Sequence, residues 1–419
     1  MIQQRPFTLD RRALLLGTGA LALSGCATTG GPAAGAFPAT QAVLDRYAGT
    51  RLPGAVVGVH RGGQAPVFLQ AGTLDFAPSS AMNADTMFRI YSMTKPVTGI
   101  AAALLVEDGR LTLDTPVSDF IPEFANLTVA IGPDASLDAR PAQRTMTVRH
   151  LLTHTAGLTY HFYDGAVSQA YRRAGIFPVT GFNLNPQPTD GPKVRDLDEM
   201  VVRLAGIPLR YEPGTDYFYS ASLDVLGCVI QRASGMAFPD FVQRRLLDPV
   251  GMGDTKWRIT PADQRRFAWT YDYANGQRVL PDGEGGAPYM EPITLYAGGA
   301  GLASTARDYL RLMRMVLDDG RAGRVRVMTP ETARLVRTDV LPTGVRARGW
   351  APNETYGFGF GGSVLDESKE YGWGGAAGTL GWADPSRDLA ATLMVQYFNA
   401  DVQIQSEVRA AIYQDIGSA

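Results

Sequence analysis

The hydrophobic and polar positions of the chain predict a sheet built from segments near its two ends. Residues 54–60 have the apolar, β-branched pattern of a strand, and a turn at 61–63 separates them from a hairpin partner at 67–71. Alternating or apolar runs divided by tight turns recur later in the chain, at 356–360, 371–378, 381–384 and 389–398. Such turns between neighbouring runs are typical of antiparallel strands, so we expect an antiparallel sheet.

Helical patterns occupy much of the remaining chain. Helices are expected at 40–49, 196–205, 223–233, 306–317 and 401–416, and the stretch 147–158 is expected to be a short helix capped by Thr147 that ends in a tight polar turn. Residues 160–194 are instead rich in Pro, Gly and aromatic residues with little periodicity, which favours a long surface loop of the kind that often forms a pocket wall. The predicted organisation is an α/β domain from 40–91 and 297–419, and a mostly helical domain from 92–296.

One further helix must be buried on most of its faces. Residues 96–106 carry no charge, and Pro96 lacks the backbone N–H that a helix interior needs, so the helix begins at or near Ser92. Gly109 supplies a natural left-handed stop. Ser92 and Lys95 are three positions apart, so their side chains share one face at the N-terminal end of this helix.

The pairing of Ser92 with Lys95 indicates an activated nucleophile. Free N–H groups and the helix dipole favour negative charge at this helix end. A desolvated lysine binds its proton less tightly and can take one from the serine hydroxyl. A capped core helix with a snorkelling lysine is the alternative interpretation. However, the chain has only four lysines, and Lys95 alone follows a serine at this spacing.

Composition and charge exclude several classes of function. At 419 residues the chain is long enough for two domains, and its formal net charge of −2 gives no basic surface for nucleic acid. Its two cysteines provide neither a disulfide framework nor a metal site, and Cys228 lies in an apolar helical stretch as a core residue. His150 and His154 are four apart without a third ligand nearby, so we expect structural histidines, no metal and no cofactor.

The N-terminus has the features of an export signal. Paired arginines at 11–12 precede an apolar run at 13–23, which is too short to span a bilayer. The paired arginines resemble a twin-arginine signal, and Leu-Ser-Gly-Cys at 23–26 resembles a bacterial lipobox.

The expected consequence is an exported protein attached to a membrane. Residues 1–26 would be the export signal with its lipobox, and lipidated Cys26 would become the first residue of the mature chain. Residues 27–39 are small and would form a flexible tether. An ordinary signal cleaved near Ala27, giving a periplasmic protein, is the alternative.

Two further segments carry candidate chemistry. Tyr219 lies in a predicted loop at 213–221. A tyrosine next to a lysine ammonium can have a lowered pKa and move protons, although a core aromatic would be the simpler interpretation of Tyr219 taken alone. In the segment 371–378, Gly374 and Gly375 allow a substrate to approach a strand backbone closely.

Together these segments resemble the penicilloyl-serine hydrolase superfamily: class C β-lactamases, D-alanyl-D-alanine carboxypeptidases and family VIII carboxylesterases. Ser-Met-Thr-Lys at 92–95 matches the first motif of the family, Tyr-Ser-Ala at 219–221 its Tyr-x-Asn motif, and Trp-Gly-Gly at 373–375 its Lys-Thr-Gly strand. The stretches at 151–158 and 297–302 are also similar to family blocks. The resemblance extends from about residue 40 to the C-terminus, and it is nearest to the family VIII carboxylesterases.

The resemblance implies a fold and a set of roles. The fold would be α+β, of the β-lactamase/DD-peptidase type, with helices flanking an antiparallel sheet, a mostly helical domain, and the active site between them. Ser92 would accept the acyl group, and Lys95 and Tyr219 would share the acid–base work. The backbone N–H groups of Ser92 and Ala376 would form the oxyanion hole. Which of Lys95 and Tyr219 takes the first proton stays open.

Two departures from the family motifs bear on the substrate. Ala221 stands where β-lactamases have Asn, and Trp373 stands where they have the Lys of the third motif. In the family these polar residues hold the amide and the carboxylate of the substrate, which Ala and Trp cannot do. Arg346 or Arg348 would be needed to restore a carboxylate contact from a loop. The residues expected to contact substrate are Trp373, Gly374, Gly375, Tyr217 and Ala221.

The function expected from these features is hydrolysis of short-chain carboxylic esters through an acyl-enzyme on Ser92. A β-lactamase, a D-alanyl-D-alanine carboxypeptidase or a D-aminopeptidase-type hydrolase is the alternative. A non-catalytic cell-wall ligand-binding protein is a lesser one, because Ser92, Lys95 and Tyr219 are all present. A conventional α/β-hydrolase is disfavoured because no serine lies in Gly-x-Ser-x-Gly. The expected partner is a small ester, with no nucleic acid.

Overall fold

The computed structural model describes residues 36–178, 192–274, 277–279, 285–349, 354–398 and 403–417. The predicted export signal, Cys26 and most of the predicted tether lie outside these residues. Within them, no helix is both long enough and apolar enough to cross a membrane.

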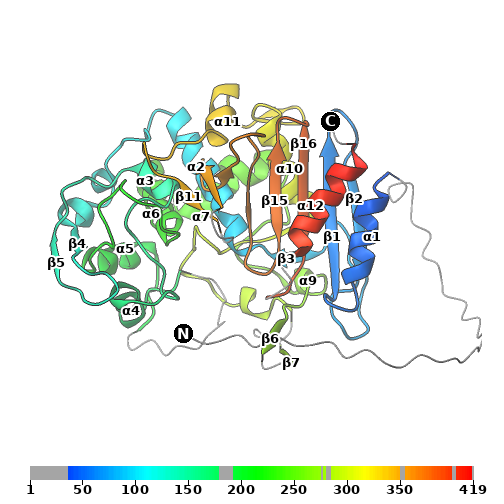
Figure 1. Ribbon diagram of the computed structural model, residues 1–419, viewed down its shortest axis with the longest axis horizontal. Helices are drawn as coiled ribbons and strands as arrows, with labels where there is room; N and C mark the ends of the chain where they lie inside the picture. The colour runs from blue at the N-terminus through cyan, green and yellow to red at the C-terminus, as the bar shows by residue number, and fades with distance from the viewer. Residues whose placement is uncertain are drawn as a thin grey trace, which may run out of the picture.

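An eight-stranded antiparallel sheet is the centre of the fold (Figure 1). The strands, in spatial order, are β11 (Ala347–Arg348), β12 (Thr355–Phe358), β13 (Ser363–Val364), β14 (Tyr371–Gly374), β15 (Leu380–Asp384), β16 (Leu389–Met394), β1 (Gly54–Arg61) and β2 (Val67–Gly72). The first and last strands of the chain are neighbours, with Val57 opposite Leu393. The sheet predicted from the two ends of the chain is therefore confirmed.

Helices cover both faces of this sheet. α10 (Ala306–Leu317) packs against β15, β16 and β1 on one face, while α1 (Pro38–Tyr47) and α12 (Gln403–Asp415) pack together on the other (Figure 1). Side chains alternate between the two faces along each strand. Val56 accordingly belongs to the core that contains α10, and Val57 to the core that contains α1 and α12.

The remaining helices form a mostly helical part beside the sheet, on the left in Figure 1. They include α2 (Thr94–Glu107), α3 (Val148–Leu152), α4 (Ala166–Arg173), α5 (Leu197–Ala205), α6 (Ser222–Ser234) and α7 (Phe238–Val242). Three further short helices are α8 (Asp248–Val250), α9 (Pro261–Gln264), which is drawn below β3, and α11 (Pro330–Val336), at the top of the molecule. α2 contacts α6, α7 and α11 and also touches β14, so it joins the two parts. Every residue of α2 from Thr94 to Leu105 is buried, which agrees with the uncharged run predicted at 96–106 and includes Lys95.

Four short two-stranded antiparallel sheets lie outside the eight-stranded sheet in the described residues. They pair β3 (Met87–Arg89) with β8 (Ala303–Thr305), β4 (Thr128–Ala130) with β5 (Ala139–Pro141), β6 (Asp272–Ala274) with β7 (Gln277–Val279), and β9 (Arg321–Ala322) with β10 (Val325–Arg326). The β3–β8 pair is functionally important because β3 leads directly into Ser92 and β8 follows the glycine-rich segment at 297–302.

Two features of the organisation differ from the sequence prediction. The expected loop at 160–194 contains α4, because Val167, Ala170 and Tyr171 recur at helical spacing and bury one face.

The chain also returns to the α/β part before residue 297, the predicted domain boundary, where it pairs with β3 and with the segment that follows β16. Ala268 N–H donates to Met87 O at 2.9 Å, and Tyr271 N–H donates to Gln396 O at 3.2 Å. Backbone hydrogen bonds of this kind produce no periodic pattern of hydrophobic residues. The sequence therefore did not indicate that residues 268–271 belong with the α/β part.

Candidate active site

Ser92 lies at a strained point of the backbone. It occupies a single 3-10 turn, Tyr91–Met93, between β3 and α2. Tyr91 has φ of +42°, a left-handed conformation that is uncommon for a residue with a side chain. Its buried ring packs edge-on against Phe398, with 5.4 Å between ring centres. Strain of this kind persists only where the surroundings fix it, so packing of Tyr91 holds Ser92 at the helix start.

Three side chains predicted to share the chemistry meet at one oxygen. Ser92 Oγ lies 2.6 Å from Tyr219 OH and 3.2 Å from Lys95 Nζ. Lys95 is only 1% exposed, and its Nζ also donates to Gly299 O at 2.8 Å. Ser92 itself is half-buried, so its hydroxyl can be reached while the two proton-transfer partners lie beside it. The arrangement suits removal of the serine proton as a bond to carbon forms.

The turn after β14 approaches Ser92 closely because it contains Gly375. A Cβ at this position would lie 2.5 Å from Ile90 O and 2.1 Å from Thr379 Oγ1, so only glycine fits. Ala376, the next residue, is exposed, and its N–H donates to no backbone carbonyl among the described residues. The structure therefore brings the two segments of the predicted oxyanion hole, Ser92 and Ala376, next to each other.

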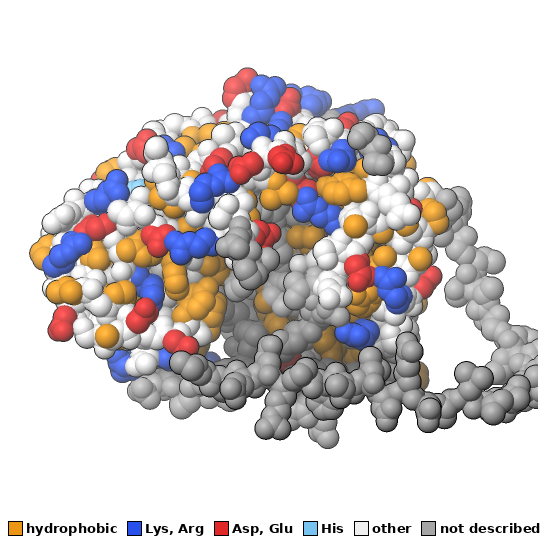
Figure 2. Space-filling view, viewed as in Figure 1, with side chains coloured by type: hydrophobic (Ala, Val, Ile, Leu, Met, Phe, Trp, Pro, Cys, Tyr) orange, Lys and Arg blue, Asp and Glu red, His pale blue; other side chains and the backbone are white. Residues whose placement is uncertain are grey.

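An aromatic cavity of about 200 Å³ adjoins these residues. It is lined by Tyr163, Tyr217, Phe218, Tyr219, Arg348, Gly349, Tyr356 and Trp373. The Trp373 ring centre lies 5.7 Å from that of Tyr219 and 5.2 Å from that of Phe358. Figure 2 shows the molecule hollowed between the helical part and the sheet part, with hydrophobic side chains gathered along the edge of the hollow.

The two arginines considered as carboxylate partners differ in position. Arg348 lines the aromatic cavity, but its guanidinium forms an ion pair with Asp216. Arg346 does not line the cavity and pairs with Asp339 at 3.2 Å and with Asp366. The one arginine that lines the cavity among the described residues is thus paired with a carboxylate.

The predicted substrate contacts are not equally accessible. Trp373 and Tyr217 line the cavity, and Gly374 is half-buried at the end of β14. Ala221 differs from the expectation: it is fully buried where α6 begins, and its N–H donates to Thr159 O at 3.1 Å. Its methyl group is therefore part of the core and not of the cavity surface.

The two histidines have structural partners. His154 is fully buried, its Nδ1 accepts the N–H of Ser220 at 3.2 Å, and its ring centre lies 4.7 Å from that of Tyr219. Burial, and secondarily the charge of Lys95, hold the pKa of His154 well below its usual value, so the ring is neutral. His150 Nδ1 accepts a backbone N–H three residues earlier. Within the described residues, no three metal-ligating side chains gather in one place.

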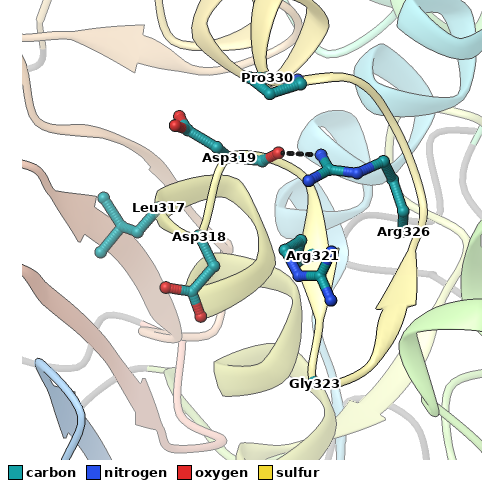
Figure 3. Close-up of a pocket in the computed structure, with 7 residues that line it drawn as sticks. All are labelled: Leu317, Asp318, Asp319, Arg321, Gly323, Arg326 and Pro330. Atoms are coloured by element: carbon teal, nitrogen blue, oxygen red, sulfur yellow. Dashed lines mark hydrogen bonds between the residues drawn. The ribbon is translucent and has the colours of Figure 1, made fainter.

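A larger depression of about 500 Å³ lies elsewhere on the surface (Figure 3). Its lining residues are Leu317, Asp318, Asp319, Arg321, Gly323, Arg326 and Pro330. Arg326 crosses it to donate to Asp319 O at 3.0 Å. None of these residues is among those that surround Ser92.

Sequence reasoning did not assign three residues that lie behind Lys95: Gly299, Asp224 and Tyr160. Gly299 acts through its backbone, which no residue type reveals. Asp224 left one signal, because it is the single charge in the apolar stretch 223–230 that becomes α6.

Comparison with known proteins decides the family. The family model described as Beta-lactamase matches residues 39–414. The chain belongs to the beta-lactamase family. This family member is 35% identical over 360 residues to Esterase EstB of Burkholderia gladioli, covering 82% of each chain. It is 30% identical to Lovastatin esterase of Penicillium rubens, over 79% of this chain and 85% of that protein.

Solved structures agree with this assignment. EstCE1, described as a hydrolase with promiscuous acyltransferase activity, superimposes with a TM-score of 0.75 at 26% identity, over 91% of this chain and 99% of that one. A D-amino acid amidase from Ochrobactrum anthropi SV3 has a TM-score of 0.66 at 19% identity, over 91% and 100%, and supports the fold alone. The predicted fold class and family are confirmed, and the beta-lactamase family member is a serine hydrolase.

Proposed function

We propose that this beta-lactamase family member is a carboxylesterase that forms an acyl-enzyme on Ser92. The observation that carries the proposal is the neutral aromatic wall beside Ser92, with Trp373 in the third motif and Arg348 paired to Asp216. A neutral ester presents a carbonyl to Ser92 and an apolar group to this wall. The similarity to two proteins named as esterases supports the same conclusion.

The cavity also sets the size of the substrate. About 200 Å³ accommodates a short acyl or alcohol chain and little more. A cephalosporin carboxylate placed there would lose its water without gaining a free cation, at a cost of several kcal/mol. Short-chain esters, of roughly two to six acyl carbons, are therefore the proposed substrates.

The contacts at Ser92 supply each step of ester hydrolysis. As Ser92 Oγ attacks the carbonyl carbon, its proton passes to the Lys95–Tyr219 pair. The carbonyl oxygen, now negative, is held by the N–H groups of Ser92 and Ala376. The intermediate collapses to the acyl-enzyme, and the departing alcohol takes the proton. Water then repeats the sequence on the acyl-enzyme and restores Ser92.

A second candidate is hydrolysis of a β-lactam or of a D-amino acid peptide. Arg348 favours it, since this cation lines the cavity and would meet a substrate carboxylate if it left Asp216. The ion pair makes such a contact a competition between two carboxylates, which weakens the binding of an anionic substrate.

Substitution of Trp373 tests the esterase proposal. Trp373→Phe keeps an apolar ring and should retain ester kcat/KM within about tenfold of the wild type, whereas Trp373→Lys should lower it by about a hundredfold. Circular dichroism of both variants controls for folding. Wild-type ester kcat/KM in Trp373→Lys would contradict the proposal.

We also propose that the protein is exported and lipidated at Cys26. The paired arginines at 11–12 and the Leu-Ser-Gly-Cys sequence at 23–26 support this. Radiolabelled palmitate should enter the wild type and not Cys26→Ser, measured by autoradiography of the purified chains. A mature wild-type chain without label would leave only ordinary secretion.

A further inference from the structure

We propose that Asp224 is a positioning residue for the proton-transfer centre: it fixes Lys95 through the backbone of Gly299 and balances the lysine charge. The inference rests on the acyl-enzyme chemistry proposed above, but it holds for an ester and a β-lactam alike.

Gly299 connects the two charged side chains directly. Its N–H donates to Asp224 Oδ1 at 2.8 Å, and its C=O accepts from Lys95 Nζ at 2.8 Å. Asp224 is 0% exposed and Lys95 is 1% exposed, so water screens neither charge. The backbone of Gly299 therefore fixes the position of Lys95 relative to Asp224 and lies between the two charged groups.

Asp224 and Tyr160 both pack closely against Gly299. A Cβ on Gly299 would lie 2.7 Å from Asp224 Oδ2 and 2.9 Å from Tyr160 OH. The carboxylate and the phenol are thus both in close contact with this glycine. Movement of Asp224 would displace the Gly299 carbonyl that holds Lys95 Nζ beside Ser92.

Asp224 is the counter-charge in a pocket of otherwise neutral groups. Lys95 Nζ lies 4.5 Å from the ring centre of Tyr219 and 5.5 Å from that of Tyr160. Burial, together with the charge of Asp224, raises the pKa of Tyr160 well above its usual range, and burial keeps His154 neutral. Burial likewise raises the pKa of Asp224 to about 7, against the opposing effect of Lys95. The Asp224 carboxyl group therefore changes charge near neutral pH, and it balances the lysine charge as the pH rises through about 7.

A purely structural role makes a different prediction. Asp224 also lies in the first turn of α6, where an acidic side chain stabilises a helix through its dipole. Loss of that interaction would lower stability but would leave the pH dependence of the chemistry unchanged. The pH profile therefore separates the two roles.

Asp224→Asn provides the test, because its amide oxygen can still accept the Gly299 N–H while the charge is lost. Two rates are measured from pH 5 to pH 10: ester kcat/KM, and covalent labelling of Ser92 by a fluorophosphonate. Loss of a buried negative charge beside the proton-transfer centre favours deprotonation of the groups around Ser92. The acidic limb of both profiles should therefore move to lower pH, with KM nearly unchanged.

Asp308→Asn is the matched control. Asp308 is a buried carboxylate of α10 that accepts the N–H of Asp254 at 2.8 Å, away from Ser92. The same substitution there should leave both limbs in place. If Asp224→Asn does not fold, Asp224→Glu and Asp224→Gln replace it, because their side chains have equal length and differ in charge. The acidic limb of the pH profile should then lie at lower pH in Asp224→Gln than in Asp224→Glu.

If the folded Asp224 variants have the same pH profiles as the wild type, the role proposed for Asp224 is contradicted, while the acyl-enzyme proposal is unaffected. A wild type that the fluorophosphonate does not label at Ser92 would overturn the acyl-enzyme proposal, and this inference with it. A shift in Asp308→Asn equal to that in Asp224→Asn would show a general effect of removing buried charge, and would also contradict the role of Asp224.

Discussion

Lys95 and Tyr219 both lie within hydrogen-bonding distance of Ser92 Oγ, so they are expected to act as one unit. Tyr219→Phe and Lys95→Ala should each lower kcat by several orders of magnitude. The double variant should be little slower than either, because groups that act together are not additive. Steady-state kinetics on a p-nitrophenyl ester measures these effects, and Ser92→Ala gives the background rate. A nearly normal rate in Tyr219→Phe would reduce Tyr219 to a core aromatic.

The sequence predicted site residues correctly where they lie close together in one helix. Ser92 and Lys95 could be paired because a helix brings positions three apart together. Tyr219 and Ala376 could be assigned only through the family resemblance, since contacts between distant segments leave no local pattern. Ala221 was misplaced because a motif position does not tell whether the side chain faces the cavity or the core.

Among the elements, the turn that follows β14 depends most closely on one residue. A methyl group on Gly375 would overlap Ile90 O and Thr379 Oγ1, so Gly375→Ala must displace the turn or the segment before Ser92. Overpacking of this kind costs about 1–3 kcal/mol of stability. Gly375→Ala should therefore lower both the melting temperature and the labelling rate of Ser92.

Gly374→Ala is the matched control for stability. The nearest atom to a Cβ at Gly374 is Thr379 O at 3.4 Å, an ordinary contact. Differential scanning calorimetry should find its melting temperature close to that of the wild type. Equal melting temperatures for Gly375→Ala and Gly374→Ala would contradict the close approach described here.

Elements with a strong hydrophobic period were predicted well. α10 begins and ends where the sequence indicated, and β1 and β2 form the predicted hairpin. α4 was missed because its eight residues lie in a segment rich in Pro and Gly, which hides a short amphipathic face. The short helix and the tight turn predicted within 147–158 are α3 and the turn after it, where His154 has a left-handed φ of +56° that residue type alone does not predict.

For the whole molecule, an acidic group between α12 and the sheet makes stability depend on pH. Glu370 is 6% exposed and accepts from Arg409 at 2.6 Å and from Tyr413 OH at 2.7 Å, both on α12. Burial raises the pKa of Glu370 to about 7, even with Arg409 beside it. The folded state then binds this proton more tightly than the unfolded state. Its stabilising contribution is complete below about pH 4.5 and is lost as the pH rises through 7.

Glu370→Gln should remove this dependence. Between pH 4.5 and pH 8 the free energy of unfolding should decrease less in the variant than in the wild type, by up to about 3 kcal/mol. Urea denaturation at several pH values measures the slope. Glu331→Gln, at an exposed position on α11, should have the wild-type slope. Identical slopes in Glu370→Gln and the wild type would contradict this account of the α12 contact.

The overall architecture was accessible from the sequence, because the antiparallel runs and the buried helix at Ser92 together match one family. The exact division into parts was not accessible, since residues near 268–271 form backbone hydrogen bonds to Met87 of β3 and to Gln396, just after β16. The cavity volume and the Arg348–Asp216 ion pair are also properties of the assembled molecule.

The most direct test of the proposed function compares two substrates on one preparation of the whole protein. Both a short p-nitrophenyl ester and a chromogenic cephalosporin can acylate Ser92, so activity on either alone decides little. The aromatic wall at Trp373 offers the cephalosporin carboxylate no free cation. We predict that kcat/KM for esters of roughly two to six acyl carbons exceeds that for the cephalosporin by at least about a hundredfold, or some 2.7 kcal/mol. Comparable values for the two substrates would contradict the esterase assignment and make Arg348 the carboxylate partner of a lactamase.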